Sequence, residues 1–253
     1  MAVFWDMELE GKNVLVTGSA KRVGRHIALR LADGGANVAV NYRTSDDEAE
    51  ETAEEIREKG VEAATVQADL SNLEDIQRLV DTVVEEFGSL DVLVNNASVF
   101  YPTPFGEVTE EDWDKNLDVN LKGPFFCSQY SARAMMENAT EPKGKIVSIA
   151  DWSGFRPYTR YLPYCISKAG IIAMTRGLAK ELAPQINVNA IAPGPVMLPP
   201  DFSEEEKKEV LENTPLQRVG SPDDIAEGVA FMVEGSDFVT GAILPIDGGR
   251  LIA

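Results

Sequence analysis

The stretch TGSAKRVGRHIA, residues 17–28, separates a strand-like run from a helical pattern, and the rest of the chain is interpreted outward from it. Before it, KNVLVTG at 12–18 is rich in β-branched residues and ends in Gly, as a buried strand does. After it, Ile27, Ala28 and Leu31 recur at helical spacing until a pair of glycines. The stretch is therefore predicted to be the loop between a first strand and a first helix.

This loop carries an unusual charge for its chain. Lys21, Arg22 and Arg25 lie close together in a protein of formal net charge −19. Backbone N–H groups and the helix dipole at such a position favour a phosphate. The G-x-G-x-x-G fingerprint is absent, because only Gly18 and Gly24 are present and Arg22 stands where a further glycine is usual. An anion-binding loop and a purely structural turn both remain open at this point.

The alternation of strand and helix repeats along the chain. The further strand candidates are ANVAVNY, VEAATVQA, DVLVNN, KIVSIA, NVNAIAP and AILPID. Helical patterns lie near 46–59, 72–87, 110–137, 163–183 and 222–234. Seven strands alternating with helices predict an α/β fold, with a doubly wound and mostly parallel sheet covered on both faces. No linker or repeat divides the chain, so one domain over 1–253 is expected.

Composition excludes several classes of protein. The 42 acidic residues against 23 basic ones argue against nucleic-acid binding. The acidic runs at 45–60 and 203–213 are typical of solvated helix faces, although a salt-adapted host is also compatible with them. Two cysteines and one histidine predict neither a disulfide framework nor a metal site. With no signal peptide and no membrane span in the sequence, we expect a cytoplasmic protein acting on a small molecule.

The end of the second predicted strand indicates which nucleotide the loop would take. An NAD-binding unit usually holds the ribose hydroxyls with an acidic residue there. This chain has Arg43, Thr44 and Ser45 instead, a cation and two hydroxyls suited to a 2′-phosphate. A surface arginine after a strand is also common.

Catalytic chemistry is predicted on YLPYCISKAG. Tyr164 and Lys168 are four positions apart and share a helix face. The ammonium is expected to lower the pKa of the phenol from about 10, toward the range of a working general acid. Such a pair also arises by chance, but here it follows KIVSIAD, a strand that ends in the carboxylate of Asp151.

Along essentially its whole length the chain resembles the short-chain dehydrogenase/reductase family. The motifs that carry the likeness are TGSAKRVG, ADL, NNAS, VNLKGPF, YCISK, NAIAPGPV and VTGAILPIDGG. The resemblance implies a single Rossmann-like domain, with a cofactor half at about 11–150 and a catalytic and substrate-lid half at about 151–253. It also implies a nicotinamide cofactor, a homotetramer, Tyr164 as proton donor and Asn120 as the active-site Asn.

The loop chemistry and the resemblance together predict NADP(H) as the cofactor. The expected cofactor-binding residues are Gly18, Lys21, Arg22, Val23, Gly24, Arg43, Thr44, Ser45, Asp69, Leu70, Asn96, Ala97, Ser98, Tyr164, Lys168, Pro193, Gly194 and Val196.

Three departures from the family pattern resemble its pteridine reductase branch. Arg22 replaces a glycine, Ser98 replaces the last residue of NNAG, and Asp151 stands where the catalytic serine is usual. A carboxylate mainly accepts hydrogen bonds, which suits the amino and ring N–H groups of a pterin better than a carbonyl oxygen. Asp151 is expected to anchor the substrate or relay a proton, unless it is a tolerated substitution with water or Ser153 in the serine's role.

The remaining substrate contacts follow from the same resemblance. Phe100 is predicted to stack on the pterin unless it is a packed loop aromatic. Trp152 is expected to line the pocket, Arg22 to face both phosphate and substrate, and 197–220 to form a lid. The main prediction is NADPH-dependent reduction of a pterin or dihydrofolate. The alternatives are a carbonyl or alcohol oxidoreductase (ketone, quinone or 3-oxoacyl substrate) and a non-enzymatic NADP sensor, against which the intact Tyr–Lys pair argues.

Overall fold

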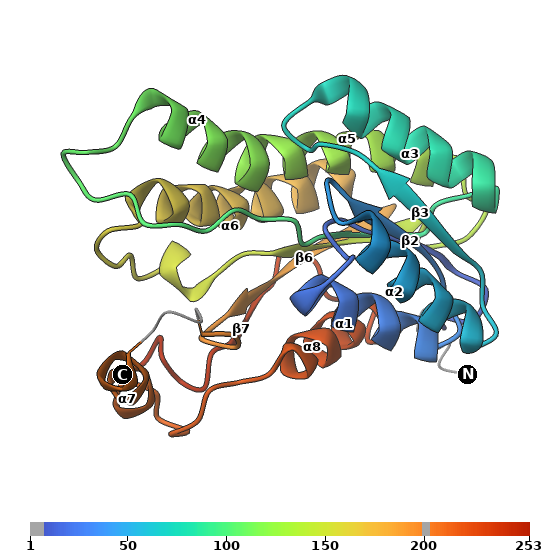
Figure 1. The fold of residues 1–253 in the computed structure, drawn as a ribbon. Coiled ribbons are helices and arrows are strands. Elements are labelled where there is room, and N and C mark those ends of the chain that lie inside the picture. The colour runs from blue at the N-terminus through green and yellow to red at the C-terminus, as the bar shows by residue number, and fades with distance from the viewer. Residues whose placement is uncertain (1–7, 199–202) are drawn as a thin grey trace.

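Seven parallel strands form one sheet in the order β3-β2-β1-β4-β5-β6-β7. The computed structural model describes residues 8–198 and 203–253. Helices cover both faces of the sheet, with α3, α4, α5 and α6 on one side and α1, α2 and α8 on the other (Figure 1). The predicted α/β, doubly wound fold is confirmed.

Each predicted strand is present. The strands are β1 (Asn13–Val16), β2 (Asn37–Tyr42), β3 (Ala63–Gln67), β4 (Val92–Asn95), β5 (Gly144–Ile149), β6 (Ile186–Pro193) and β7 (Ile243–Ile246). The helices are α1 (Arg22–Asp33), α2 (Asp46–Glu58), α3 (Leu73–Phe87), α4 (Glu110–Leu117), α5 (Gly123–Met135), α6 (Leu162–Leu182), α7 (Glu204–Glu212) and α8 (Pro222–Glu234), with a 3₁₀ turn at Trp152–Gly154.

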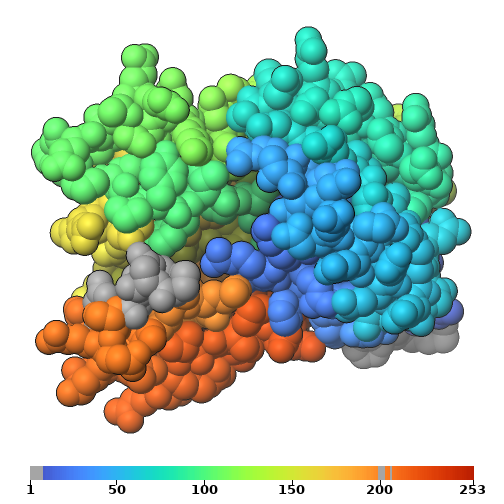
Figure 2. Space-filling view, in the orientation of Figure 1, coloured from blue at the N-terminus to red at the C-terminus, as the bar shows by residue number. Residues whose placement is uncertain are grey.

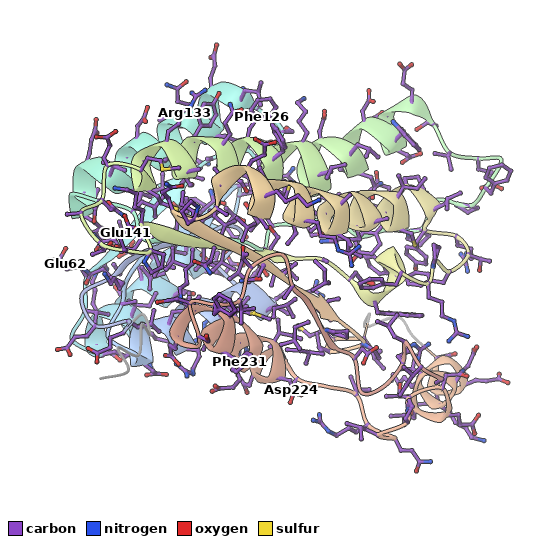
Figure 3. The ribbon with its side chains drawn as sticks, turned by 180° about the vertical axis from the view of Figure 1, so that it is seen from behind. Glu62, Phe126, Arg133, Glu141, Asp224 and Phe231 are labelled. Atoms are coloured by element: carbon purple, nitrogen blue, oxygen red, sulfur yellow. The ribbon has the colours of Figure 1, made fainter. Side chains whose placement is uncertain are left out.

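Two apolar cores hold the layers together. On one face, Ile27 and Leu31 of α1 pack with Val229 of α8 against the sheet. On the other face, Leu79 of α3 and Met135 of α5 fill the space above the same strands. Strands buried on both sides read as continuous apolar runs, which is why they were visible in the sequence. Figure 3 shows the two helical layers from behind. Phe126 and Arg133 lie in the layer of α5, and Phe231 lies in the layer of α8 on the other side of the sheet.

The strand order reverses between β1 and β4. The chain runs outward from β1 through β2 to β3, then returns to pair β4 with the other side of β1. At such a switch point the loops after the carboxyl ends of neighbouring strands diverge, and a ligand can bind between them. This geometry collects the residues that follow β1, β2, β4, β5 and β6.

The helix predicted over 110–137 is interrupted. A π turn at Asp118–Lys122 separates α4 from α5, and the N–H of Gly123 donates to the carbonyl of Asp118, five residues back. Pro124 follows directly, and a proline has no N–H to continue the α-helical pattern and clashes with the carbonyl four residues before it. The wider turn accommodates both effects.

The acidic run at 203–213, interpreted as a solvated helix face, contains α7, which lies away from the sheet beside the C-terminal residues (Figure 1). Part of the predicted lid, 199–202, lies outside the described residues. Within 8–198 and 203–253, no helix is long and apolar enough to cross a membrane. In the same ranges, no group of three His, Cys, Asp or Glu side chains is placed to hold a metal ion.

Candidate active site

One cavity of about 1020 Å³ opens at the carboxyl edge of the sheet. In Figure 2 the surface is hollowed between the blue cofactor-loop side, the green segment near residue 100 and the orange C-terminal part. Of the sequence-predicted site residues, all except Asn120 line this cavity. The structure therefore brings together residues from both halves of the chain.

The first loop forms one end of the cavity. Lys21 is the N-cap of α1 but its side chain caps no N–H group, and the first turn contains no acidic residue. The free N–H groups and the helix dipole are therefore available to an anion. Lys21 and Arg22 line the cavity, whereas Arg25 is turned away and pairs with Glu55.

The glycines of this loop allow its backbone to pack closely on itself and on the segment after β4. Gly18 has φ +60, and a Cβ there would come within 2.9 Å of Ala97 Cα. A Cβ on Gly24 would meet the carbonyl oxygen of Gly18 at 2.4 Å. Arg22, in the place of the usual glycine, has φ +57, a left-handed conformation that only glycine adopts without strain. This packing fixes the loop at the cavity, where its backbone N–H groups and the start of α1 suit a pyrophosphate.

Arg43, Thr44 and Ser45 lie on the same cavity after β2. The Arg43 guanidinium is 3.9 Å from the carboxylate of Asp69, and both side chains are partly exposed. An exposed pair at that distance contributes little, so Arg43 remains able to bind a phosphate. Ser45 is the N-cap of α2 and its hydroxyl makes no capping bond. These groups fit the 2′-phosphate of NADP.

Tyr164 and Asp151 are joined at the centre of the cavity. The Tyr164 hydroxyl donates to Asp151 Oδ2 at 3.0 Å, and Asp151 Oδ1 accepts the Ser153 backbone N–H at 2.7 Å. Lys168 lies one helical turn from Tyr164 and donates through Nζ to the Ile149 carbonyl at 2.9 Å. Ser153 is fully buried and does not line the cavity, so its hydroxyl is not placed to replace a catalytic serine.

The electrostatics differ from the expectation that Lys168 lowers the pKa of Tyr164. Burial, and next the charge of Asp151, raise the pKa of Tyr164 well above its usual value. Burial lowers the pKa of Lys168 to about 8, against the opposing effect of Asp151. Burial also raises the pKa of Asp151, although Ser153 and Lys168 oppose it. The three groups therefore form a buried set in which burial has the largest effect on every pKa.

Asn120 lies behind the cavity wall. Its side chain is buried and absent from the cavity lining. Its Oδ1 accepts from the Val99 N–H at 2.8 Å and the Ser98 hydroxyl at 3.2 Å, and its Nδ2 donates to the Val99 carbonyl at 3.0 Å. The π turn carries this amide, and its hydrogen bonds position the segment after β4. The active-site role that the family resemblance implies for Asn120 stays a prediction.

Aromatic side chains form the other end of the cavity. Phe100 is 45% exposed and stacks on Tyr161 with ring centroids 4.5 Å apart and an interplanar angle of 5°. Its ring and that of Tyr164 are nearly perpendicular, with centroids 4.9 Å apart. Trp152 stacks on Tyr158 at 5.5 Å. The predicted aromatic residues line a wall that suits a flat substrate.

Several residues on or behind the cavity were not predicted. Tyr158, Tyr161 and Arg250 line the cavity, and so does Asn41, whose Oδ1 accepts the Gly18 N–H. Thr17 does not line it, and its hydroxyl accepts the N–H of Asn96. The three tyrosines within RPYTRYLPY were a visible cluster, and Arg250 follows the last strand by four residues, where a strand-end search finds it. The hydrogen bonds of Thr17 and Asn41 join residues far apart in the sequence, so no local pattern predicted them.

Comparisons with known proteins agree with this arrangement. Residues 18–250 match the family model described as Enoyl-(Acyl carrier protein) reductase. The chain is 38% identical to a 3-oxoacyl-[acyl-carrier-protein] reductase of Staphylococcus aureus over 94% of its length and 97% of that protein.

Two solved structures extend the comparison. A Burkholderia cenocepacia short-chain dehydrogenase in complex with NADP is 35% identical, with a TM-score of 0.89, 96% of this chain covered and 99% of that one. A blue fluorescent protein from a metagenomic library in complex with NADPH is 33% identical, with the same TM-score and coverage. The NADP(H) expectation agrees with both. None of these names mentions a pterin, and the S. aureus protein fits the carbonyl alternative better. The chain belongs to the short-chain dehydrogenase/reductase family.

Proposed function

We propose that the chain is an NADPH-dependent reductase of a flat nitrogen heterocycle of the dihydropterin or dihydrofolate class. The observation that carries this proposal is the hydrogen bond from the Tyr164 hydroxyl to the Asp151 carboxylate. A carboxylate at this position accepts N–H groups of an aminopyrimidine ring, whereas an ionised carboxylate cannot donate to a carbonyl oxygen.

The residues of the chain divide the chemistry between them. When bound, NADPH supplies the hydride. Tyr164 holds the proton that passes to a ring nitrogen, and Asp151 anchors the substrate N–H groups beside it. Lys168, adjacent on the helix, offsets the negative charge that the phenol acquires when it gives up its proton. Phe100 and Trp152 line the cavity with aromatic surface that suits a planar ring.

Carbonyl reduction is the second candidate, and two observations favour it. The S. aureus relative is named for a 3-oxoacyl substrate. Burial raises the pKa of Asp151, and a protonated Asp151 would have a hydroxyl to donate to a carbonyl oxygen. In this candidate, the substrate is a ketone, a quinone or a 3-oxoacyl thioester.

A substrate panel with one variant separates the two candidates. NADPH oxidation is measured with dihydrobiopterin, dihydrofolate, simple ketones, a quinone and a 3-oxoacyl thioester. The proposal expects turnover of the pterins, and it expects Asp151→Ser to reduce that turnover while allowing some ketone reduction, because serine donates to a carbonyl oxygen.

A matched control tests whether the measured turnover belongs to this site. Tyr164→Phe is expected to lower any genuine turnover by roughly 10²–10⁴, the range of general acid catalysis. Turnover of ketones or the thioester alone by the unmodified protein would overturn the pterin proposal in favour of carbonyl reduction.

A further inference from the structure

Arg250 brings a positive charge to the end of the cavity that lies beyond Asp151. Its guanidinium carbon is 4.9 Å from the centre of the Trp152 ring, and Trp152 directly follows Asp151. Both side chains line the cavity. This cation–π contact holds the guanidinium next to the proposed substrate wall.

The guanidinium has little of its hydrogen-bonding capacity in use. Nη1 donates to the Val210 carbonyl at 3.0 Å and to the Thr214 hydroxyl at 3.3 Å. Both acceptors are neutral, and among the side chains that the structure describes no carboxylate lies within ion-pair distance of Arg250. An arginine has five N–H donors in a planar fork, and a carboxylate or phosphate uses two of them at once.

A half-buried cation with no ion-pair partner among the described side chains is unusual in this chain. The chain carries 42 acidic residues against 23 basic ones, so carboxylate partners are abundant. Burial lowers the pKa of Arg250, and the nearby Arg156 acts in the same direction. Both effects disfavour the charged form, and a bound anion would offset them.

From these contacts we infer that Arg250 is a specificity-determining residue that binds an anionic group, a carboxylate or a phosphate, on the part of the substrate that extends beyond the reducible ring. This inference uses the proposed function in one respect: it assumes that the reducible ring of the substrate lies at Tyr164. A folate-type tail supplies a carboxylate, and the carrier arm of an acyl thioester supplies a phosphate. The shared chemistry is a charge-assisted, bidentate hydrogen bond to the guanidinium.

Two other charged residues on the cavity bear on this assignment. Glu209 of α7 is exposed, and its carboxylate raises the pKa of Arg250 without reaching ion-pair distance. Lys115 of α4 is exposed and lies over the Tyr101 ring at 5.2 Å, on the wall that contains Phe100. Glu209 opposes an anionic tail at Arg250, and Lys115 is the competing cation.

The experiment compares substrates that differ in the charge of the tail. Arg250→Gln is expected to raise KM for dihydrofolate about ten- to hundredfold, the range for loss of a charge-assisted hydrogen bond, and to leave KM for dihydrobiopterin nearly unchanged. Arg250→Lys should restore part of the affinity. Glu209→Gln should lower KM for dihydrofolate. Arg78→Gln, which removes an exposed guanidinium outside the site cavity, is the matched control and should change neither KM.

Additional measurements test the role of Arg250 without relying on pterin reduction. Folate and pterin binding to the protein saturated with NADP are measured by titration calorimetry, which needs no turnover. Ketone pairs (4-acetylbenzoate with its methyl ester) and thioester pairs (a phosphopantetheine thioester with the shorter N-acetylcysteamine one) repeat the comparison, and they identify a carboxylate or a phosphate as the preferred anion. If the protein turns over no pterin, but Arg250→Gln raises KM only for the charged ketone or thioester, the proposed function is wrong and Arg250 is still the anion site.

Two results would overturn the inference. Equal loss of affinity for charged and neutral ligands in Arg250→Gln would mean that Arg250 only holds α7 and the residues after it, through Val210 and Thr214. A charge-dependent loss in Lys115→Gln and not in Arg250→Gln would place the anion on the other wall.

Discussion

At the scale of single residues, the site depends on how Tyr164, Asp151 and Lys168 share protons in a buried setting. The hydrogen bond between Tyr164 and Asp151 opposes ionisation of the phenol, while Lys168 lies close enough to favour it. Because the pKa of Tyr164 is raised, the phenol keeps its proton at neutral pH until a substrate atom takes it. This state suits reduction, in which the protein gives up a proton.

The lowered pKa of Lys168 predicts a pH dependence with a definite sign. Lys168 is protonated below about pH 8 and loses its charge above it. Since the ammonium offsets the charge left on Tyr164, kcat/KM for reduction should fall as pH rises through about 8. The measurement is a pH profile of kcat/KM at saturating NADPH.

Asp151→Asn serves as the internal test of that assignment. The Asp151 carboxylate raises the pKa of Lys168, so its removal should move the descending limb to lower pH. A limb that stays in place in this variant would show that another group causes it.

Arg43 predicts the cofactor preference. Arg43→Ala is expected to raise KM for NADPH far more than KM for NADH, because only NADPH has a 2′-phosphate to pair with the guanidinium. Steady-state kinetics with both cofactors measures the change. Arg78→Ala, which removes an exposed arginine outside the site cavity, is the control. Equal use of NADPH and NADH by the unmodified protein would contradict the preference.

At the scale of helices and strands, two glycines give opposite expectations. Gly24 lies in the first turn of α1, where an added Cβ meets the Gly18 carbonyl at 2.4 Å and Asn96 Nδ2 at 2.5 Å. Gly177 is exposed in α6, where a Cβ meets nothing within 4 Å. Gly24→Ala should destabilise the protein and weaken NADPH binding, whereas Gly177→Ala should stabilise it by about 0.5–1 kcal/mol.

Denaturant unfolding and NADPH titration of both variants check this pair. A Gly24→Ala protein that binds NADPH like the unmodified one would mean that the loop does not form the phosphate cradle.

The elements themselves were largely predictable from the sequence, and the reasons are local. Strands such as β5 are buried on both faces, so composition alone identifies them. The π turn was not predictable in the same way, because its residues keep a helical pattern and Pro124 marks only where the ladder must change.

The residues of the candidate site were also predictable only in part. Residues that follow strands, such as Arg43 and Asp151, could be assigned from motif and position. The side chain of Asn120 turned out to face the backbone of Val99, and Lys168 failed to lower the pKa of Tyr164. Orientation and burial decide both, and neither is contained in the spacing of the residues.

At the scale of the whole molecule, net charge dominates the response to salt. A formal charge of −19 repels itself, and the ion pairs on the surface contribute little each. Raising NaCl from about 0.05 to about 1 M shortens the Debye length to about 3 Å and should raise Tm. A thermal melt series measures this, with KCl at equal ionic strength as the control. A Tm that falls with salt would show that ion pairs outweigh the repulsion.

The homotetramer implied by the family resemblance stays a prediction, for light scattering to test.

The strand order also has a consequence for how the chain reaches its structure. β1 lies inside the sheet between β2 and β4, and its pairing with β4 joins residues about 78 positions apart. At a synthesis rate of roughly 5–20 residues per second, β1 waits for several seconds before β4 is made. During that interval β1 has β2 as a neighbour on one side and an apolar, unpaired edge on the other. The switch point that creates the binding cavity is thus also the edge at which a nascent chain is most exposed to wrong pairing.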